Sequence, residues 1–143
     1  MGSDKMKPEL VRRAEATTAT MNKYRNKPFN WKAGTTCIHL LRFHLRQLGY
    51  KPEPLPRIRS AIGARRALDK RGWQHVGDML DSLLPRVPGH ASMALGDIAM
   101  LRSGDGFGAI TICAGPLKLM GWHDDVAGMA VMEPHDVEGV WRV

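Results

Sequence analysis

The chain is poor in cysteine and has no long apolar run. Its two cysteines, Cys37 and Cys113, are too few for a disulfide-stapled secreted domain and fit a reducing cytoplasm, with one bridge between them left open. No stretch approaches the roughly 20 consecutive apolar residues that span a bilayer, and the first residues lack the apolar core of a signal peptide. We therefore expect a soluble, unprocessed chain without a membrane span.

Acidic residues are outnumbered by basic ones. The chain has 21 Lys and Arg against 14 Asp and Glu, a formal net charge of +7, which favours nucleic acid, acidic polymers or an acidic neighbouring subunit as partners. Its 143 residues, 43% of them hydrophobic, suffice for one core. We expect an N-terminal helical segment over residues 1–26 and a single domain over 27–143.

Helix signals lie in the first half of the chain and strand signals in the second. Apolar residues recur at steps of three and four over residues 37–48, which predicts a helix ended by Gly49. Further helices are expected over 7–26, 57–70 and 76–84, the first with a thin apolar stripe typical of a surface helix. Short apolar runs bounded by turns predict strands at 99–101, 109–113 and 137–143. This order predicts an α+β fold with N-terminal helices packed on a small antiparallel sheet.

A cysteine stands at the start of the best-defined predicted helix. Thr35 or Thr36 can cap this helix through a hydroxyl, and Cys37 follows directly. The unpaired N–H groups and the dipole at a helix N-terminus favour the thiolate, the reactive form of cysteine. Cys37 is therefore a candidate nucleophile, and the alternative is a small buried residue that packs the helix on the sheet. Cys113 lies in an apolar strand and is expected in the core.

Three short motifs follow one another in a familiar order. They are the aromatic-Trp-x-x-Gly-x-x-Cys stretch at residues 29–37, the Gly96-Asp97 pair and the glycine-containing stretch 106–110. This order resembles the NlpC-type cysteine peptidases of bacterial cell walls. The Pro-Phe-x-Trp opening and the Trp-Arg-Val ending at 141–143 resemble more closely a related domain of unknown function encoded among the tail genes of phages and prophages. The resemblance implies a papain-like, NlpC-type fold.

The chain departs from the peptidase pattern at the catalytic positions. Thr36 stands where the peptidases usually have Asp, and Ile38-His39 replaces their Ser-Gly. Their catalytic histidine opens the strand after the Gly-Asp pair, where this chain has residues 106–109 and no histidine. A cysteine peptidase also needs a proton donor for the leaving amine, which an imidazole normally supplies. Cys37 is therefore predicted to be a vestigial nucleophile.

Other histidines of the chain could replace the missing base. His90, His123 and His135 flank the predicted strands and are the weak candidates; His44 lies about 10 Å along the helix from Cys37, too far for direct proton transfer. His123-Asp124-Asp125 resembles a metal-binding fragment, but no second cluster accompanies it, so we expect a polar turn, no metal and no cofactor. Gly96-Asp97 is expected to be a turn that starts a strand rather than a triad acid.

Two further features are candidate partner contacts. The helix predicted over 57–70 has a basic face, which is either a binding surface or an ordinary solvated face, formed by Arg57, Arg59, Arg65, Arg66 and Lys70. No aromatic residue interleaves with these side chains, so nucleic acid is not the expected partner. Trp141 is either an interface anchor or a core residue.

These expectations combine into one functional hypothesis. The resemblance implies a structural component of a bacteriophage or prophage tail, at the tail tip or baseplate, with a degenerate peptidase fold. Such a protein is made in the host bacterial cytoplasm, resides in the virion tail and binds other tail subunits. The alternatives are an active cysteine peptidase or amidase that cleaves peptidoglycan during infection, and a basic nucleic-acid-binding module.

Overall fold

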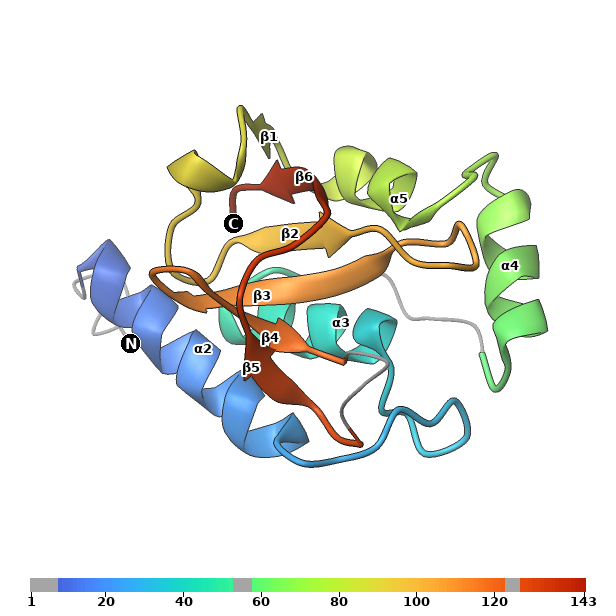
Figure 1. Ribbon diagram of the computed structural model, residues 1–143, viewed down its shortest axis with the longest axis horizontal. Coiled ribbons are helices and arrows are strands. Elements are labelled where there is room, and N and C mark those ends of the chain that lie inside the picture. The colour runs from blue at the N-terminus through green and yellow to red at the C-terminus, as the bar shows by residue number, and fades with distance from the viewer. Residues whose placement is uncertain (1–7, 53–57, 123–126) are drawn as a thin grey trace.

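The computed structural model describes residues 8–52, 58–122 and 127–143, and within them the chain has the predicted α+β organisation (Figure 1). The helices are α2 (Glu9–Tyr24), α3 (Cys37–Gln47), α4 (Ala61–Asp69), α5 (Val76–Leu83) and the short 3-10 helix η1 (His90–Ser92). The strands are β1 (Arg86–Val87), β2 (Ile98–Leu101), β3 (Ala109–Gly115), β4 (Lys118–Gly121), β5 (Ala130–Met132) and β6 (Val137–Trp141). In this described part, no helix is both long and apolar enough to cross a bilayer.

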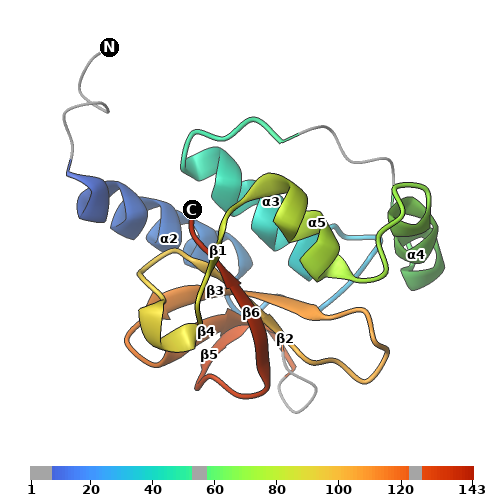
Figure 2. The ribbon, with the colours of Figure 1, turned by 90° about the horizontal axis from the view of Figure 1, so that it is seen from above.

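The strands form one antiparallel sheet in the order β1-β6-β2-β3-β4-β5. Helices α2, α3 and α5 lie on one face of this sheet, and α4 stands to one side (Figure 2). Alternate residues of β2 point to opposite faces: Ile98 and Met100 join the large core under the helices, whereas Ala99 and Leu101 join a smaller cluster on the other face. Both faces of the central strand are therefore buried.

One predicted helix and three strands that were not predicted distinguish the structure from the sequence expectation. The thin apolar stripe predicted a surface helix near the N-terminus, but α2 buries Ala16, Thr17 and Thr20 and packs against α3. The threonine hydroxyls can be buried because each lies within hydrogen-bonding distance of the carbonyl four residues earlier, at 2.7 Å for Thr17 and 2.9 Å for Thr20. Strands β1, β4 and β5 were not predicted, since each has only two to four residues.

The segment directly after α2 forms backbone hydrogen bonds with the segment directly before β5. The N–H of Asn26 donates to the carbonyl of Met129 at 3.1 Å, and the Met129 N–H donates to the Lys27 carbonyl at 3.0 Å. The neighbouring Gly128 permits this approach, because a Cβ placed there would lie 2.6–2.8 Å from backbone atoms of Asn26. This contact holds the segment before Cys37 against the sheet.

We predict that Gly128→Ala destabilises the fold by about 1–3 kcal/mol, because the clash involves backbone atoms that cannot rotate away. Urea unfolding monitored by tryptophan fluorescence measures the change. The control is Gly104→Ala, whose added Cβ has no atom within 4 Å. Equal stability of the two variants would contradict the proposed close approach.

Candidate functional site

Cys37 opens α3 as predicted, and Thr36 is the cap. The backbone of Thr36 is extended, with φ −122° and ψ 170°, and its hydroxyl oxygen accepts a hydrogen bond from the His39 N–H at 3.4 Å. The Thr35 hydroxyl instead donates to the Pro28 carbonyl at 2.7 Å. The two threonines therefore have different roles: Thr36 starts the helix and Thr35 holds the preceding loop.

The Cys37 side chain is buried, with 8% of the residue exposed. Burial raises the pKa of its thiol and outweighs the contacts with backbone groups of Ile110 and of the first residues of α3, which favour the thiolate. The negative charge of Asp105 adds to the rise. Cys37 is therefore a thiol at neutral pH, and the thiolate expected from its place at the helix start is disfavoured by desolvation.

The glycine-containing stretch at residues 106–110 leaves no space for a side chain at Gly108. This glycine has φ +86°, and a Cβ placed there would lie 2.7 Å from the Met100 sulfur and 3.0 Å from a Val76 methyl carbon. Gly106 has open space around it, but its φ of +73° is rarely adopted by other residues. The apolar side chains of Met100 and Val76 thus fill the space beside Gly108.

The two histidines on the helix of Cys37 are bound elsewhere. His39 Nδ1 lies 2.7 Å from the Thr36 hydroxyl, so the imidazole belongs to the helix cap. Burial and the nearby charge of Arg42 lower the pKa of His39, which keeps it neutral. His44 bridges two other elements, with Nδ1 at 3.0 Å from the Thr20 hydroxyl and Nε2 at 2.8 Å from the Gly96 carbonyl.

The three histidines considered as replacement bases do not assemble around Cys37 in the described residues. His90 is exposed on η1, and His135 is exposed with Nδ1 at 3.8 Å from an Asp136 oxygen. His123 lies outside the described residues. Within those residues, no imidazole hydrogen-bonds to Cys37 or contributes to its pKa shift. In the same part of the chain, no group of three or more His, Cys, Asp and Glu side chains could hold a metal ion.

Gly96-Asp97 is a structural turn, as the sequence predicts, and its carboxylate is fully buried. Asp97 Oδ2 accepts from the Ala94 N–H at 2.9 Å, which closes the turn. Two cations meet the same carboxylate: an Arg13 terminal nitrogen lies 2.9 Å from Oδ1, and Arg142 Nε lies 2.9 Å from Oδ2. The Val143 N–H also donates to Oδ1 at 3.2 Å. Asp97 thus joins α2, the start of β2 and the residues after β6.

His44 completes this buried polar group, and the sequence interpretation missed it. The Gly96 carbonyl can only accept, so Nε2 carries the proton, and Nδ1 of the neutral ring is an acceptor 3.0 Å from the Thr20 hydroxyl, which shares its one proton between this nitrogen and the Ala16 carbonyl. Burial lowers the pKa of His44 to about 4, partly offset by the hydrogen bond to Gly96. The spacing Leu40, His44, Leu48 could have revealed its burial, because residues four apart share a helix face.

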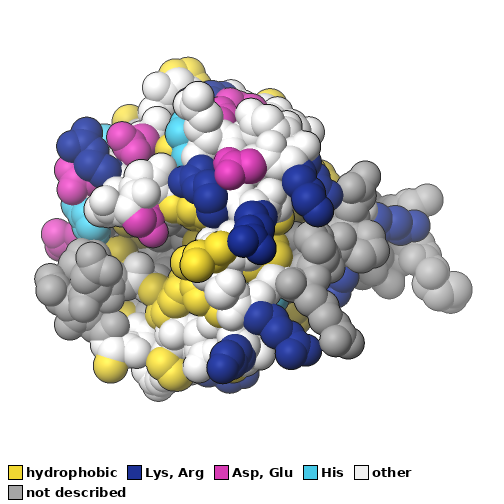
Figure 3. All heavy atoms as spheres, turned by 90° about the vertical axis from the view of Figure 1, so that its right-hand side faces the viewer, with side chains coloured by type: hydrophobic (Ala, Val, Ile, Leu, Met, Phe, Trp, Pro, Cys, Tyr) yellow, Lys and Arg dark blue, Asp and Glu magenta, His cyan; other side chains and the backbone are white. Residues whose placement is uncertain are grey.

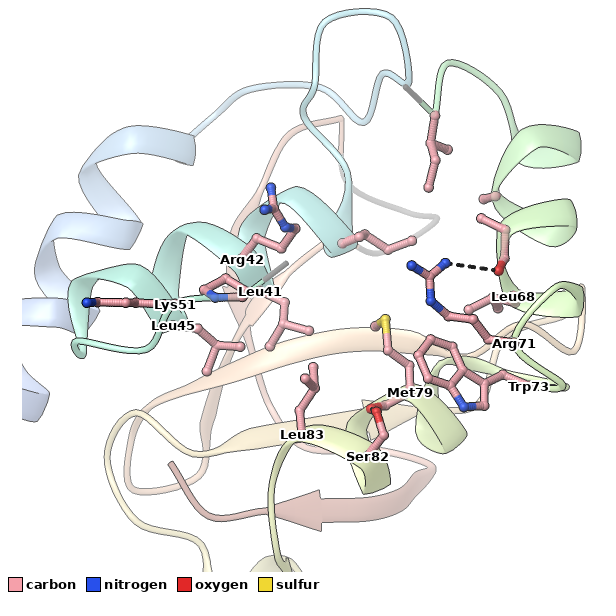
Figure 4. A pocket seen from close by; sticks show the side chains of 15 residues that line it. Leu41, Arg42, Leu45, Lys51, Leu68, Arg71, Trp73, Met79, Ser82 and Leu83 are labelled. Atoms are coloured by element: carbon pink, nitrogen blue, oxygen red, sulfur yellow. Dashed lines mark hydrogen bonds between the residues drawn. The ribbon is translucent and has the colours of Figure 1, made fainter. Parts of the chain in front are cut away.

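A cavity of about 610 Å³ opens between α3, α4 and α5 (Figure 4). Leu41 and Leu45 contribute its wall on α3, and Met79 contributes from α5. Trp73 and Arg71 border it on the side of α4; the Arg71 guanidinium donates to the Ala67 carbonyl at 3.5 Å. Cys37 is not among the residues described along this cavity, so the cavity and the cysteine do not form one site.

The predicted basic helix begins later than expected, at Ala61, and its cations are unequally placed. Arg59, Arg66 and Lys70 are exposed, whereas Arg65 is half-buried, with its guanidinium 5.1 Å from the Phe107 ring centroid and a hydrogen bond to the Gln74 carbonyl. Arg57 lies outside the described residues. Figure 3 shows the face that carries α4, where Lys and Arg side chains surround hydrophobic ones.

Trp141 lies in the core and not on a surface. Its side chain is fully buried, and Nε1 donates to an Asp81 oxygen at 2.9 Å. The Arg86 guanidinium lies 4.7 Å from the ring centroid and pairs with the same Asp81 at 2.7 Å. Of the two alternatives for Trp141, the core placement holds, so this side chain offers no contact area to a partner.

The fold and this arrangement define a class: an α+β domain with a buried cysteine at a helix start and a buried Gly-Asp turn. A family model matches residues 10–143, and the chain therefore belongs to the family described as "Domain of unknown function (DUF6950)". No curated protein matches the chain.

We predict that Asp97→Asn destabilises the fold by about 3 kcal/mol, because Arg13 and Arg142 lose the charge of their buried partner. Thermal and urea unfolding measure this change. The control is Glu138→Gln, which removes the partner of an exposed ion pair with Arg102 and is expected to change stability by about 0.5 kcal/mol or less. Similar losses in both variants would contradict the role given to Asp97.

We also predict that the protein loses stability as pH falls from about 6.5 to about 4. In this window His44 takes up a proton in the unfolded chain but not in the folded one, because its folded pKa is about 4. The full shift corresponds to about 3 kcal/mol. Urea midpoints against pH test this, and His44→Gln should flatten the profile whereas the exposed-site control His90→Gln should not. An unchanged slope in His44→Gln would contradict the assignment.

Proposed function

We propose that the chain is a structural component of a phage or prophage tail, built on a papain-like, NlpC-type fold whose catalytic set has degenerated. The observation that carries the proposal is the packing around Cys37. The thiol is buried with a raised pKa, and no imidazole reaches it among the described residues. At Gly108, Met100 and Val76 occupy the space that a new side chain would need.

The family resemblance gives this proposal its biological setting. A cysteine-bearing helix packs against the sheet, with β3 the strand in contact with it. The Gly-Asp turn and the Trp-Arg-Val ending, two motifs on which the resemblance depends, meet in one buried ion-pair group at Asp97. Motifs that stabilise the fold in this way are kept when catalytic activity is lost, because the fold still needs them. A structural protein descended from a peptidase would therefore retain them.

The active peptidase is the second candidate, and the place of Cys37 at the start of α3 favours it. Its nucleophile would be the Cys37 sulfur, and its substrate a peptide bond in peptidoglycan. The two candidates differ in the state of the thiol: a nucleophile must be accessible and ionised, whereas a packing residue is neither.

We predict that iodoacetamide alkylates Cys37 in the folded protein at least about 10-fold more slowly than in urea, because burial limits both access and ionisation. Peptide mapping by mass spectrometry separates Cys37 from Cys113. Peptidoglycan fragments should show no turnover, with Cys37→Ser as the matched variant. Fast alkylation together with turnover that disappears in Cys37→Ser would replace the structural proposal with the peptidase.

The tail assignment is tested separately. Tails purified from cells that carry the encoding phage or prophage should contain the chain, as detected by mass spectrometry. Its absence from tails would remove the assignment even if Cys37 proves inert.

A further inference from the structure

All of the net charge of the chain resides in one continuous segment. Residues 16–52 contain seven Lys and Arg and no Asp or Glu, which leaves 14 of each for the rest of the chain. The segment comprises most of α2, the loop before α3 and α3 itself. The seven cations are Lys23, Arg25, Lys27, Lys32, Arg42, Arg46 and Lys51. The segment therefore carries a charge of +7 with no acidic residue of its own.

Five aromatic side chains form a continuous row on the same segment and on the neighbouring Trp122. Ring centroids are 5.9 Å apart for Phe43 and Tyr24, 6.0 Å for Tyr24 and Trp122, 5.8 Å for Trp122 and Phe29, and 5.4 Å for Phe29 and Trp31. Each pair meets edge to face. Tyr24 is buried, the others are partly or largely exposed, and 44% of Phe29 is exposed.

Cations lie directly on this row. Lys23 Nζ is 4.7 Å from the Phe43 centroid, and Lys27 Nζ is 5.9 Å from that of Tyr24. Burial raises the pKa of Tyr24, and the charges of Arg42 and Arg46 oppose the rise. Within the described residues, no carboxylate pairs with Lys23 or Lys27. We name Lys23, Lys27, Phe29, Trp31, Phe43 and Trp122 the aromatic-basic face.

We propose that the aromatic-basic face docks an acidic neighbouring protein subunit of the tail, a proposal that rests on the proposed function. Aromatic side chains such as the exposed Phe29 are enriched in protein interfaces, and partner carboxylates around such an apolar centre would complement Lys23 and Lys27 at its rim. A second copy of this chain does not fit, because the same face would meet its own positive charge. Single-stranded nucleic acid fits less well, because edge-to-face packing and Lys23 cover ring faces that bases need for stacking.

The test uses full-length chains that complement a deletion of the gene in the encoding phage or prophage. Quantitative mass spectrometry measures the amount of chain in purified tails. We expect the double variant Lys23→Glu/Lys27→Glu, and separately Phe29→Ala, to reduce this amount at least about 10-fold. The matched controls on α4, Arg66→Glu/Lys70→Glu and Ile62→Ala, change equally exposed charges and an exposed apolar side chain, and should be incorporated like the unmodified chain.

Thermal unfolding checks that each variant is folded. We expect every variant to fold, because all of the changed side chains are exposed. Absence of the unmodified chain from tails would overturn the proposed function and this proposal together. Presence of every variant at equal amounts, or equal loss of the α4 controls, would overturn this proposal alone. Two results on the purified chain would also overturn the docking proposal. One is binding of a labelled 20-nucleotide dT oligomer that the double variant Lys23→Glu/Lys27→Glu abolishes, and the other is self-association that the same double variant abolishes.

Discussion

The buried carboxylate of Asp97 is the constraint on which the rest of the structure depends. A charge without solvent must be paired, and Arg13 from α2 and Arg142 from the residues after β6 both reach it at 2.9 Å. His44 holds the carbonyl of the preceding glycine, so α3 is joined to the same turn. Arg13, which is 84 residues from Asp97 along the chain, and Val143, which is 46 residues away, are therefore fixed relative to one another by a single side chain.

The parts of this arrangement that could be predicted are those encoded locally. The periodic leucines and the threonine cap gave the start of α3 correctly, because both signals act within one or two turns. The Gly96-Asp97 turn was predicted for the same reason. The partners Arg13 and Arg142 could not be predicted, since nothing in the local pattern tells a buried arginine from an exposed one. Short strands such as β5 also carry too few residues for a pattern.

Cys37 shows how a local signal can be reversed by tertiary structure. A helix N-terminus stabilises a nearby negative charge by roughly 0.3–1 kcal/mol at an exposed site. Full burial shifts a titrating group by up to about 3–5 pKa units, which is several times larger, and it favours the neutral thiol. The place of Cys37 directly after the capping Thr36 is visible in the sequence. The 8% exposure of Cys37 instead depends on tertiary packing against β3 and the loop that precedes β3. The burial of a cysteine therefore says more about whether its thiol ionises than its position on a helix does.

The same argument bears on what the segment before α3 does. If Cys37 serves packing, the loop from Pro28 to Thr36 has no substrate to position, yet it is anchored by the Thr35 hydroxyl and by the bridge between Asn30 and Thr35. Such anchoring holds Phe29 and Trp31 at the surface in one geometry, and a preorganised aromatic pair loses little conformational entropy when it binds. An anchored loop of this kind is suited to recognition, because it holds the exposed Phe29 and the half-buried Trp31 in a fixed arrangement.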